Sequence, residues 1–214
     1  MDLFDYMRED KMEKESPLAS RLRPRTLDEI VGQQHILGRD KMLYRAIKAD
    51  KLSSIILYGP PGTGKTTIAK VIANTTSAAF TQINATVAGK KDMEQVVQEA
   101  KDRMGMYGKR TILFVDEIHR FNKGQQDYLL PFVEDGTLIL IGATTENPSF
   151  EVIRPLLSRC QLYVLKSLEK EDLLELLQRA ITTDAVLKER KIELKETTAM
   201  LRFSGGDARK LLNI

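Results

Sequence analysis

Five short apolar runs, separated by longer stretches of helical character, restrict the fold of this chain more than any other feature. The runs are rich in branched side chains, as buried strands are, and they cover residues 54–58, 80–84, 111–115, 138–142 and 161–165. The stretches between them suit crossover helices and cover residues 64–76, 91–104, 123–134 and 150–158. Because strands that alternate with helices form parallel sheets covered on both faces, the sequence predicts a three-layer α/β core with a parallel five-stranded sheet.

The composition is that of a folded globular protein. The chain has 214 residues, 42% of them hydrophobic and 29% charged. It contains no apolar run of the ~18–20 residues that a membrane span needs, and its acidic start does not resemble a secretory signal, so we expect a cytoplasmic protein. One cysteine, Cys160, excludes an internal disulfide and argues against a structural zinc site. A net charge of +3 permits contact with a polyanion without indicating one.

The sequence divides into three parts. Residues 1–16 are polar and are expected to form a flexible arm, and residues 17–165 hold the predicted core. From 166 to 214 the strand signals stop, and we predict a small helical lid with helices that begin at Ser167 and near residue 192 and restart after Gly205-Gly206. The last residues stop in an uncapped helical pattern, so the lid is expected to be truncated and the chain to be part of a longer protein.

A glycine-rich loop directly follows the first predicted strand and precedes a helix. It matches GxxxxGK[ST] at every fixed position. Backbone N–H groups in such a loop can surround a phosphate at a helix N-terminus. Lys65 would reach the β- and γ-phosphates, and the Thr66 hydroxyl would bind Mg²⁺. The predicted nucleotide-binding residues here are Gly59, Pro60, Pro61, Gly62, Thr63, Gly64, Lys65, Thr66 and Thr67.

Two adjacent acids end the third predicted strand. Asp116 is expected to hold Mg²⁺ through water, and Glu117 is expected to orient and polarise the water that attacks the γ-phosphate. An ordinary acidic turn at a strand end is the alternative interpretation. The second acid favours a hydrolase over a small-molecule kinase, which could work with one.

The sequence also resembles a known family. The segments GPPGTGKT, LFVDEIHR, the Thr144-Thr145-Glu146-Asn147 strand end, Leu157-Ser158-Arg159-Cys160 and Gly205-Gly206-Asp207-Ala208-Arg209 resemble the AAA+ ATPases of the clamp-loader group. Within that group, the stretch from Asp116 to Glu134 and the segment IGATTENPSF resemble the replication-associated recombination protein A family. The resemblance implies the strand order 5-1-4-3-2, with ATP and Mg²⁺ as cofactors.

The resemblance also implies roles for residues near the phosphates. Asn147 or the threonines before it, Thr145 among them, would be sensor 1, which positions the water; a strand cap is the alternative. Arg159 would be the arginine finger that completes a neighbouring subunit's site, with Arg154 as a weaker candidate and a surface salt bridge as the alternative.

Three further assignments follow from the same resemblance. Arg209 would be sensor 2 on the lid. The segment Val31-Gly32-Gln33, with Leu22-Arg23-Pro24, would border the adenine. Lys90 and Lys91 would contact DNA without reading bases, although a solvated loop explains these lysines as well.

Two residues near the predicted site are expected to have no catalytic function. His119 is interpreted as a packing or hydrogen-bonding residue, and Cys160 as a small buried hydrophobe.

Taken with the resemblance, these patterns predict an oligomeric, DNA-dependent ATPase that acts at stalled or damaged replication forks. Expected partners are forked, gapped or single-stranded DNA, single-strand binding protein, and further copies of the chain joined through the missing C-terminal region. The alternatives are a clamp-loader subunit, a branch-migration motor, or a nucleotide-gated scaffold with little hydrolysis.

Overall fold

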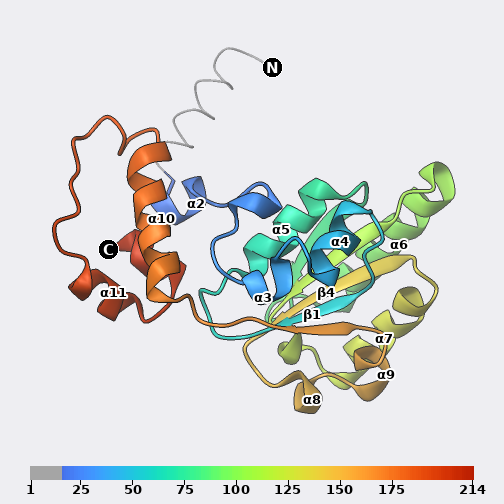
Figure 1. Ribbon diagram of the computed structural model, residues 1–214. Helices are drawn as coiled ribbons and strands as arrows, with labels where there is room; N and C mark the ends of the chain where they lie inside the picture. The colour runs from blue at the N-terminus through green and yellow to red at the C-terminus, as the bar shows by residue number, and fades with distance from the viewer. Residues whose placement is uncertain (1–15) are drawn as a thin grey trace. The chain divides into compact units, whose positions relative to one another are not determined.

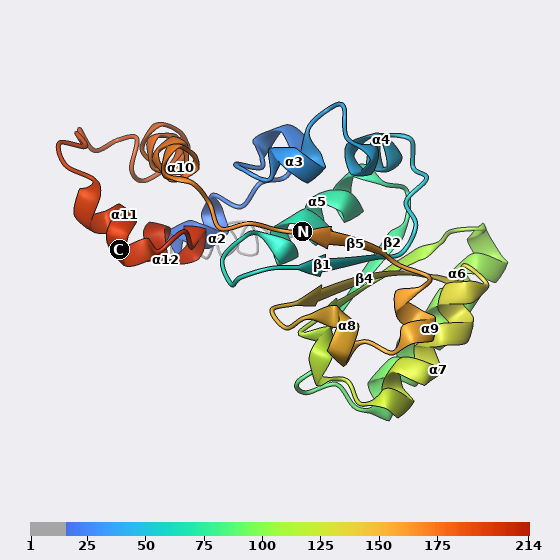
Figure 2. The same cartoon turned by 60° about the horizontal axis from the view of Figure 1, so that its bottom comes forward.

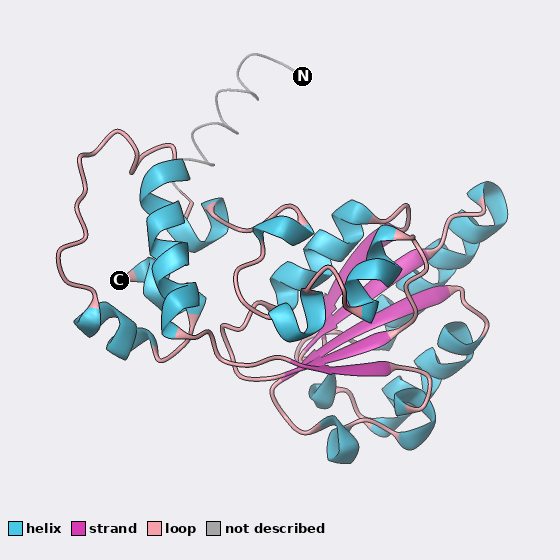
Figure 3. Cartoon of the chain, viewed as in Figure 1, coloured by secondary structure: helices cyan, strands magenta, loops and turns pink. Residues whose placement is uncertain are grey.

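All five predicted strands are present in the computed structural model, which describes residues 16–214. The strands are β1 (Ile55–Tyr58), β2 (Ala79–Asn84), β3 (Thr111–Asp116), β4 (Leu138–Thr144) and β5 (Gln161–Val164). They form one sheet in the order β2-β3-β4-β1-β5, and all neighbouring strands are parallel (Figure 3). The α/β class and the order implied by the resemblance are therefore confirmed.

Side chains alternate between the two faces of the sheet, and each face has its own apolar core. On β3, Ile112 and Phe114 pack into one core, whereas Leu113 and Val115 pack into the other. Figure 2 shows α3 (Gln34–Leu37), α4 (Met42–Lys48) and α5 (Lys65–Thr75) on one side of the sheet. The other side is covered by α6 (Lys90–Tyr107), α7 (Lys123–Glu134), α8 (Pro148–Glu151) and α9 (Arg154–Leu157). Both faces are buried along the central strands β1, β3 and β4, which explains their continuous apolar runs in the sequence, whereas the edge strands β2 and β5 are more exposed.

Local capping chemistry sets the ends of the longer helices. In α7, the side chain of Asn122 accepts a hydrogen bond from the Gln125 backbone, and the Gln125 side chain accepts one from the Asn122 backbone. In α6, Asp92 accepts from the backbone N–H of Gly89, and Gly108 ends the helix in the left-handed region at φ 59°. These caps are readable in the sequence, since each is built from residues three apart or from a terminal glycine.

The single helix predicted for residues 150–158 is wrong, because the structure has two short helices, α8 and α9. Pro155 has no backbone N–H, so it cannot donate to the Glu151 carbonyl as a continuous helix would require. Instead the buried side chain of Gln126 donates to the Glu151 carbonyl at 2.9 Å and accepts from the backbone of Ile153 at 2.9 Å. A side chain from α7 thus replaces the missing helical hydrogen bonds.

The chain forms two units, residues 25–166 and a helical unit that combines residues 16–24 with 167–214. Figure 1 shows the helices of the second unit: α2 (Leu18–Arg21), α10 (Lys170–Thr183), α11 (Thr198–Ser204) and α12 (Ala208–Asn213). The structure differs from the predicted division in one respect, since residues 17–24 belong to the helical unit. The predicted flexible arm, residues 1–16, lies outside the described residues except for Ser16.

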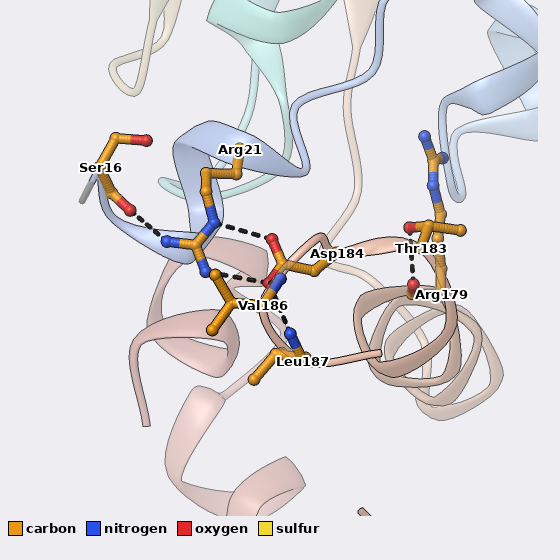
Figure 4. Close-up of polar contacts among 7 residues, drawn as sticks. All are labelled: Ser16, Arg21, Arg179, Thr183, Asp184, Val186 and Leu187. Atoms are coloured by element: carbon orange, nitrogen blue, oxygen red, sulfur yellow. Dashed lines mark hydrogen bonds and ion pairs between the residues drawn. The ribbon is translucent and has the colours of Figure 1, made fainter. Parts of the chain in front are cut away.

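An ion pair explains why the early segment packs with the late helices. Arg21 donates from Nε and Nη2 to the two carboxylate oxygens of Asp184, at 2.7 and 3.1 Å (Figure 4). Asp184 also accepts from the backbone N–H groups of Val186 and Leu187. The hydrogen bonds from Arg21 lower the pKa of Asp184 below its usual range, because they stabilise the charged carboxylate.

Two helix boundaries in the helical unit differ from the predicted ones. The helix expected from Ser167 begins at Lys170, where Asp172 accepts from the backbone of Glu169. The helix expected from residue 192 begins only at Thr198. Between them, Asp184 ends α10 and turns the chain, and residues 190–197 form no helix. Within residues 16–214, no helix is both long and apolar enough to cross a membrane.

Candidate active site

The glycine-rich loop connects β1 to α5, as predicted, and close packing fixes its first residue. A Cβ atom on Gly59 would lie only 2.5 Å from the backbone oxygen of Leu165. The Gly59 N–H donates to the carbonyl of Thr144 at the end of β4, at 3.2 Å. Gly64 precedes the helix at φ 95°, a backbone conformation that favours glycine. The loop therefore has its shape because two neighbouring strand ends contact it.

Lys65 lies in the first turn of α5, and its side chain folds over the loop. Its ammonium donates to the carbonyls of Gly59 and Pro60, both at 2.7 Å, and the residue is only 8% exposed. The Thr63 hydroxyl donates to Pro60 as well, at 2.9 Å. Thr66 and Thr67 follow in the same turn and are half-buried. The positive charge is thus held at the N-terminus of a helix, beside the loop's backbone N–H groups.

The two acids lie where strand β3 ends. Asp116 is the last residue of β3, and Glu117 follows in the left-handed region at φ 57°. That conformation is uncommon for a residue with a side chain, and strained residues of this kind concentrate at functional sites. The backbone then turns into a short 3₁₀ helix, Ile118–Arg120. Both acids are half-buried, so their carboxylates have access to a ligand.

His119 contacts both the second acid and a neighbouring strand. Its Nε2 lies 3.2 Å from a carboxylate oxygen of Glu117, and its Nδ1 lies 2.9 Å from the hydroxyl of Thr144. Its side chain is only 6% exposed. The interpretation of His119 as a hydrogen-bonding residue is confirmed, and its partner Thr144 is 25 residues away in the chain.

Gln33, the last residue of the Val31-Gly32-Gln33 segment expected to border the adenine, connects that segment to the phosphate loop. Gln33 is buried, and its backbone adopts the left-handed conformation at φ 60°. Its amide donates to the carbonyls of Lys166 at 2.7 Å and Thr63 at 3.4 Å, and its oxygen accepts from the N–H of Lys166 at 3.1 Å. Gly32 beside it is buried and Val31 is half-buried. The segment expected to border the adenine is therefore attached to the loop through Gln33.

The sensor 1 candidates have different environments. The side chain of Asn147 accepts from the backbone of Ser149 and caps α8, and the residue is exposed. Thr145 is half-buried one residue beyond the end of β4. Thr144 is fully buried and bound to His119. The sensor 1 assignment stays a prediction for Asn147 and Thr145.

Arg159 lies on the surface beyond α9. Its guanidinium pairs with Glu134 at the end of α7, at 3.0 Å, and its side chain is 52% exposed. Arg154, the second candidate, is exposed in α9. Cys160 is half-buried against the apolar core on the sheet face that α6, α7, α8 and α9 cover. Burial raises the pKa of its thiol to about 12, which agrees with an unreactive packing residue.

The remaining predicted residues lie away from the loop in sequence and are all exposed. Arg209 is on α12 of the helical unit. Lys90 and Lys91 form the first turn of α6, one residue earlier than the predicted helix start, and Lys90 lies 3.6 Å from Glu94. The roles of these three residues stay predictions.

Thr66 and Asp116 offer one hydroxyl and one carboxylate to a metal ion. No group of three or more His, Cys, Asp or Glu side chains that could hold an ion alone occurs among residues 16–214. Mg²⁺ in nucleotide sites is typically bound by one or two side-chain oxygens together with phosphates and water. The donor set therefore suits Mg²⁺ that is bound together with a nucleotide.

A complete phosphate loop and an acid-ending strand on one parallel sheet define a P-loop nucleotide-binding protein. Residues 55–168 match the family described as ATPase family associated with various cellular activities (AAA). The chain therefore belongs to the AAA family.

Within the AAA family, the chain is similar to several curated proteins. The chain is 51% identical over 201 residues to replication-associated recombination protein A of Coxiella burnetii, covering 92% of this chain and 45% of that protein. It is 49% identical to the Escherichia coli K12 protein of the same name, covering 92% and 44%. It is 39% identical to ATPase WRNIP1 of Dictyostelium discoideum, covering 99% and 24%. The chain thus spans less than half the length of these relatives.

Solved structures of the RuvB Holliday junction branch migration motor of Thermotoga maritima share the fold. One is 28% identical with a TM-score of 0.70, and the likeness covers 89% of this chain and 63% of that one.

Proposed function

We propose that this chain binds and hydrolyses ATP with Mg²⁺ and acts on DNA at stalled or damaged replication forks, in replication-associated recombination and repair. The observation that carries the proposal is the pair Asp116 and Glu117 beside a complete phosphate loop, with Glu117 held in a strained conformation. A nucleotide-binding scaffold has no need of the second acid. Recombination and the fork are proposed from the similarity to replication-associated recombination protein A.

In this mechanism the residues of the chain bind, orient and polarise. The loop N–H groups and Lys65 would hold the β- and γ-phosphates, and Lys65 would exchange its contacts with Gly59 and Pro60 for phosphate oxygens. Thr66 and Asp116 would hold Mg²⁺, which supplies neutralisation of phosphate charge. Glu117 would orient a water molecule and accept its proton.

Completion of the site would require a second copy of the chain. Arg159 is exposed on the surface, and we propose that it stabilises charge on the phosphates of a neighbouring subunit. Arg209 would report nucleotide binding to the helical unit. Homo-oligomerisation and stimulation by DNA are parts of this proposal, as is binding of single-strand binding protein in the cytoplasm.

A branch-migration motor is the second candidate, because the fold is shared with the RuvB motor at 28–30% identity. The two candidates differ in substrate: a motor would turn over fastest on four-way junctions, whereas the favoured function predicts preference for forked or gapped DNA.

Steady-state ATP hydrolysis tests the proposal. Turnover would be measured for this chain and for a longer protein that contains it, without DNA and with forked, gapped and four-way DNA. We expect Glu117→Gln to bind nucleotide normally and to lose about 10²- to 10⁴-fold in turnover. Tight nucleotide binding with no turnover in any form would contradict hydrolysis and leave a nucleotide-gated scaffold.

A further inference from the structure

We propose that His119 is a positioning residue that holds the Glu117 carboxylate in place and couples it, through Thr144, to the phosphate loop. The inference rests on the proposed hydrolytic role of Glu117. It starts from a buried imidazole with a contact at each nitrogen, 3.2 Å to the Glu117 carboxylate and 2.9 Å to the Thr144 hydroxyl.

The backbone conformation of Glu117 brings its carboxylate close to His119 Nε2. Residues two apart on a regular helix do not face each other. Here Glu117 has φ 57° and its carbonyl accepts from the N–H of Arg120 at 2.8 Å, so the chain turns tightly. His119 therefore points back toward the preceding acid, while Ile118 between them is buried in the core. The strained conformation thus positions a pair of side chains.

In the contact between His119 and Glu117, the imidazole is the donor and the carboxylate is the acceptor. An ionised carboxylate only accepts, so attraction at 3.2 Å requires a proton on His119 Nε2. In the neutral imidazole, Nδ1 then has no proton and accepts from the Thr144 hydroxyl. In the charged imidazolium, Nδ1 donates to Thr144, and the hydroxyl donates to the Glu146 carbonyl 3.1 Å away. In both forms the N–H that faces Glu117 is the same.

Thr144 connects this pair to two loops. Its hydroxyl accepts from the N–H of Glu146 at 2.9 Å, in the loop that carries the sensor 1 candidates. Its carbonyl accepts from the N–H of Gly59, the first residue of the phosphate loop. Because Thr144 is fully buried at the end of β4, displacement of either loop would be transmitted through His119 to the Glu117 carboxylate.

Two substitutions separate the contacts of the ring. The amide nitrogen of glutamine can take the position of Nε2, so His119→Gln keeps a donor toward Glu117, whereas His119→Asn is too short to reach it. Because a small misplacement of a catalytic group can cost up to about 100-fold, we expect His119→Asn to lower kcat roughly 10- to 100-fold. We expect the KM for ATP and the nucleotide Kd to stay unchanged, and His119→Gln to keep most of kcat. Equal kcat values in the two variants would overturn the proposal.

Nuclear magnetic resonance tests the contact between His119 and Glu117 without a measurement of ATP hydrolysis. The chain has two histidines, so ¹⁵N labelling of histidine yields two imidazole patterns, and His35 is the internal reference. We expect the His119 proton on Nε2, and a shift of that resonance in Glu117→Gln while His35 is unaffected. A proton on Nδ1 alone, or an unchanged His119 resonance in Glu117→Gln, would overturn the proposal. If the wild type binds but never hydrolyses ATP, the proposed function fails while this measurement still tests the contact.

Discussion

The backbone oxygen of Leu165 lies so close to Gly59 that this position of the phosphate loop has no room for a side chain. Leu165 directly follows β5, and β5 pairs with β1, the strand that leads into the loop. The two strands are adjacent, so the loop must pass close to the chain where it leaves the sheet. The glycine is thus required by packing as well as by access to phosphate.

We predict that Gly59→Ala destabilises residues 25–166 by about 1–3 kcal/mol, because the added Cβ overpacks against backbone that cannot move aside. Nucleotide affinity should fall as well. Thermal unfolding and binding of a fluorescent ATP analogue check both effects.

Gly105→Ala is the matched control for this change. Gly105 lies within α6, and a Cβ there meets nothing within 4 Å. Alanine should stabilise the helix by roughly 0.5–1 kcal/mol. A similar loss in both variants would contradict the close-packing explanation.

At the scale of elements, α2 and α10 are joined by a pair that only the fold brings together. Arg21 and Asp184 are 163 residues apart in the chain, and the Asp184 side chain is 2% exposed. Asp184 also holds the turn after α10 through two backbone N–H groups. The carboxylate therefore stabilises both the turn and the attachment of residues 16–24.

We expect Asp184→Asn to destabilise the helical unit by about 1–2 kcal/mol, since the amide has no charge to pair with Arg21 and its nitrogen cannot accept the hydrogen bond from Arg21 Nε. Hydrogen exchange of amides in α2 and α10 measures the effect. Glu193→Gln is the control, because the Glu193–Lys195 pair is more than 80% exposed and 3.9 Å long, and such pairs contribute little. Equal protection in the two variants would count against the ion pair.

The same carboxylate predicts a pH dependence. Arg21 lowers the pKa of Asp184 in the folded chain, so its stabilising contribution is fully present above the unfolded pKa of about 3.9. It is lost as the pH falls through the lower, folded pKa. Unfolding measured from pH 6 to pH 2 should show a smaller acid destabilisation in Asp184→Asn than in the wild type, and parallel curves would contradict this.

At the scale of the whole molecule, Arg159 tests whether a site is shared between copies. Its side chain is exposed, pairs with the partly exposed Glu134 and donates to the Ser158 hydroxyl at 3.3 Å. We expect Arg159→Ala and Glu117→Gln to be inactive alone and to recover activity when mixed, roughly a quarter of wild type for random assembly. ATP hydrolysis against mixing ratio is the measurement.

Two outcomes are informative in that experiment. Full activity of Arg159→Ala alone would remove this residue from catalysis. Loss in Arg154→Ala with recovery by mixing would transfer the role to the second candidate arginine.

The predicted contact of Lys90 and Lys91 with DNA can also be tested on the whole molecule. Each phosphate contact on single-stranded DNA contributes about 0.7 to the slope of log affinity against log salt. The double alanine variant should lower that slope by roughly 1.4, measured by fluorescence anisotropy. The exposed pair Lys188 and Lys191 in the helical unit is the control, and an equal reduction there would leave the α6 lysines as solvated residues.

The strands of the sheet, three of the four predicted crossover helices, the phosphate loop and the two acids could be predicted from the sequence. Each of these depends on local spacing: branched residues in short runs, glycines and a lysine at fixed positions, and acids directly after a strand. Alternating burial of Ile112 and Leu113 on the two faces follows from the period of a strand alone.

The tertiary structure alone decided the contacts that orient the site. Gln33 contacts Lys166 across 133 residues, His119 contacts Thr144 across 25, and Gln126 supplies the hydrogen bonds that the break between α8 and α9 leaves unmade. Such partners depend on which strand ends lie side by side, and no pattern in neighbouring residues records that. The residues of the phosphate loop and the two acids can therefore be predicted from the sequence. The residues that hold them in place cannot, because the partners of buried polar groups depend on the packing.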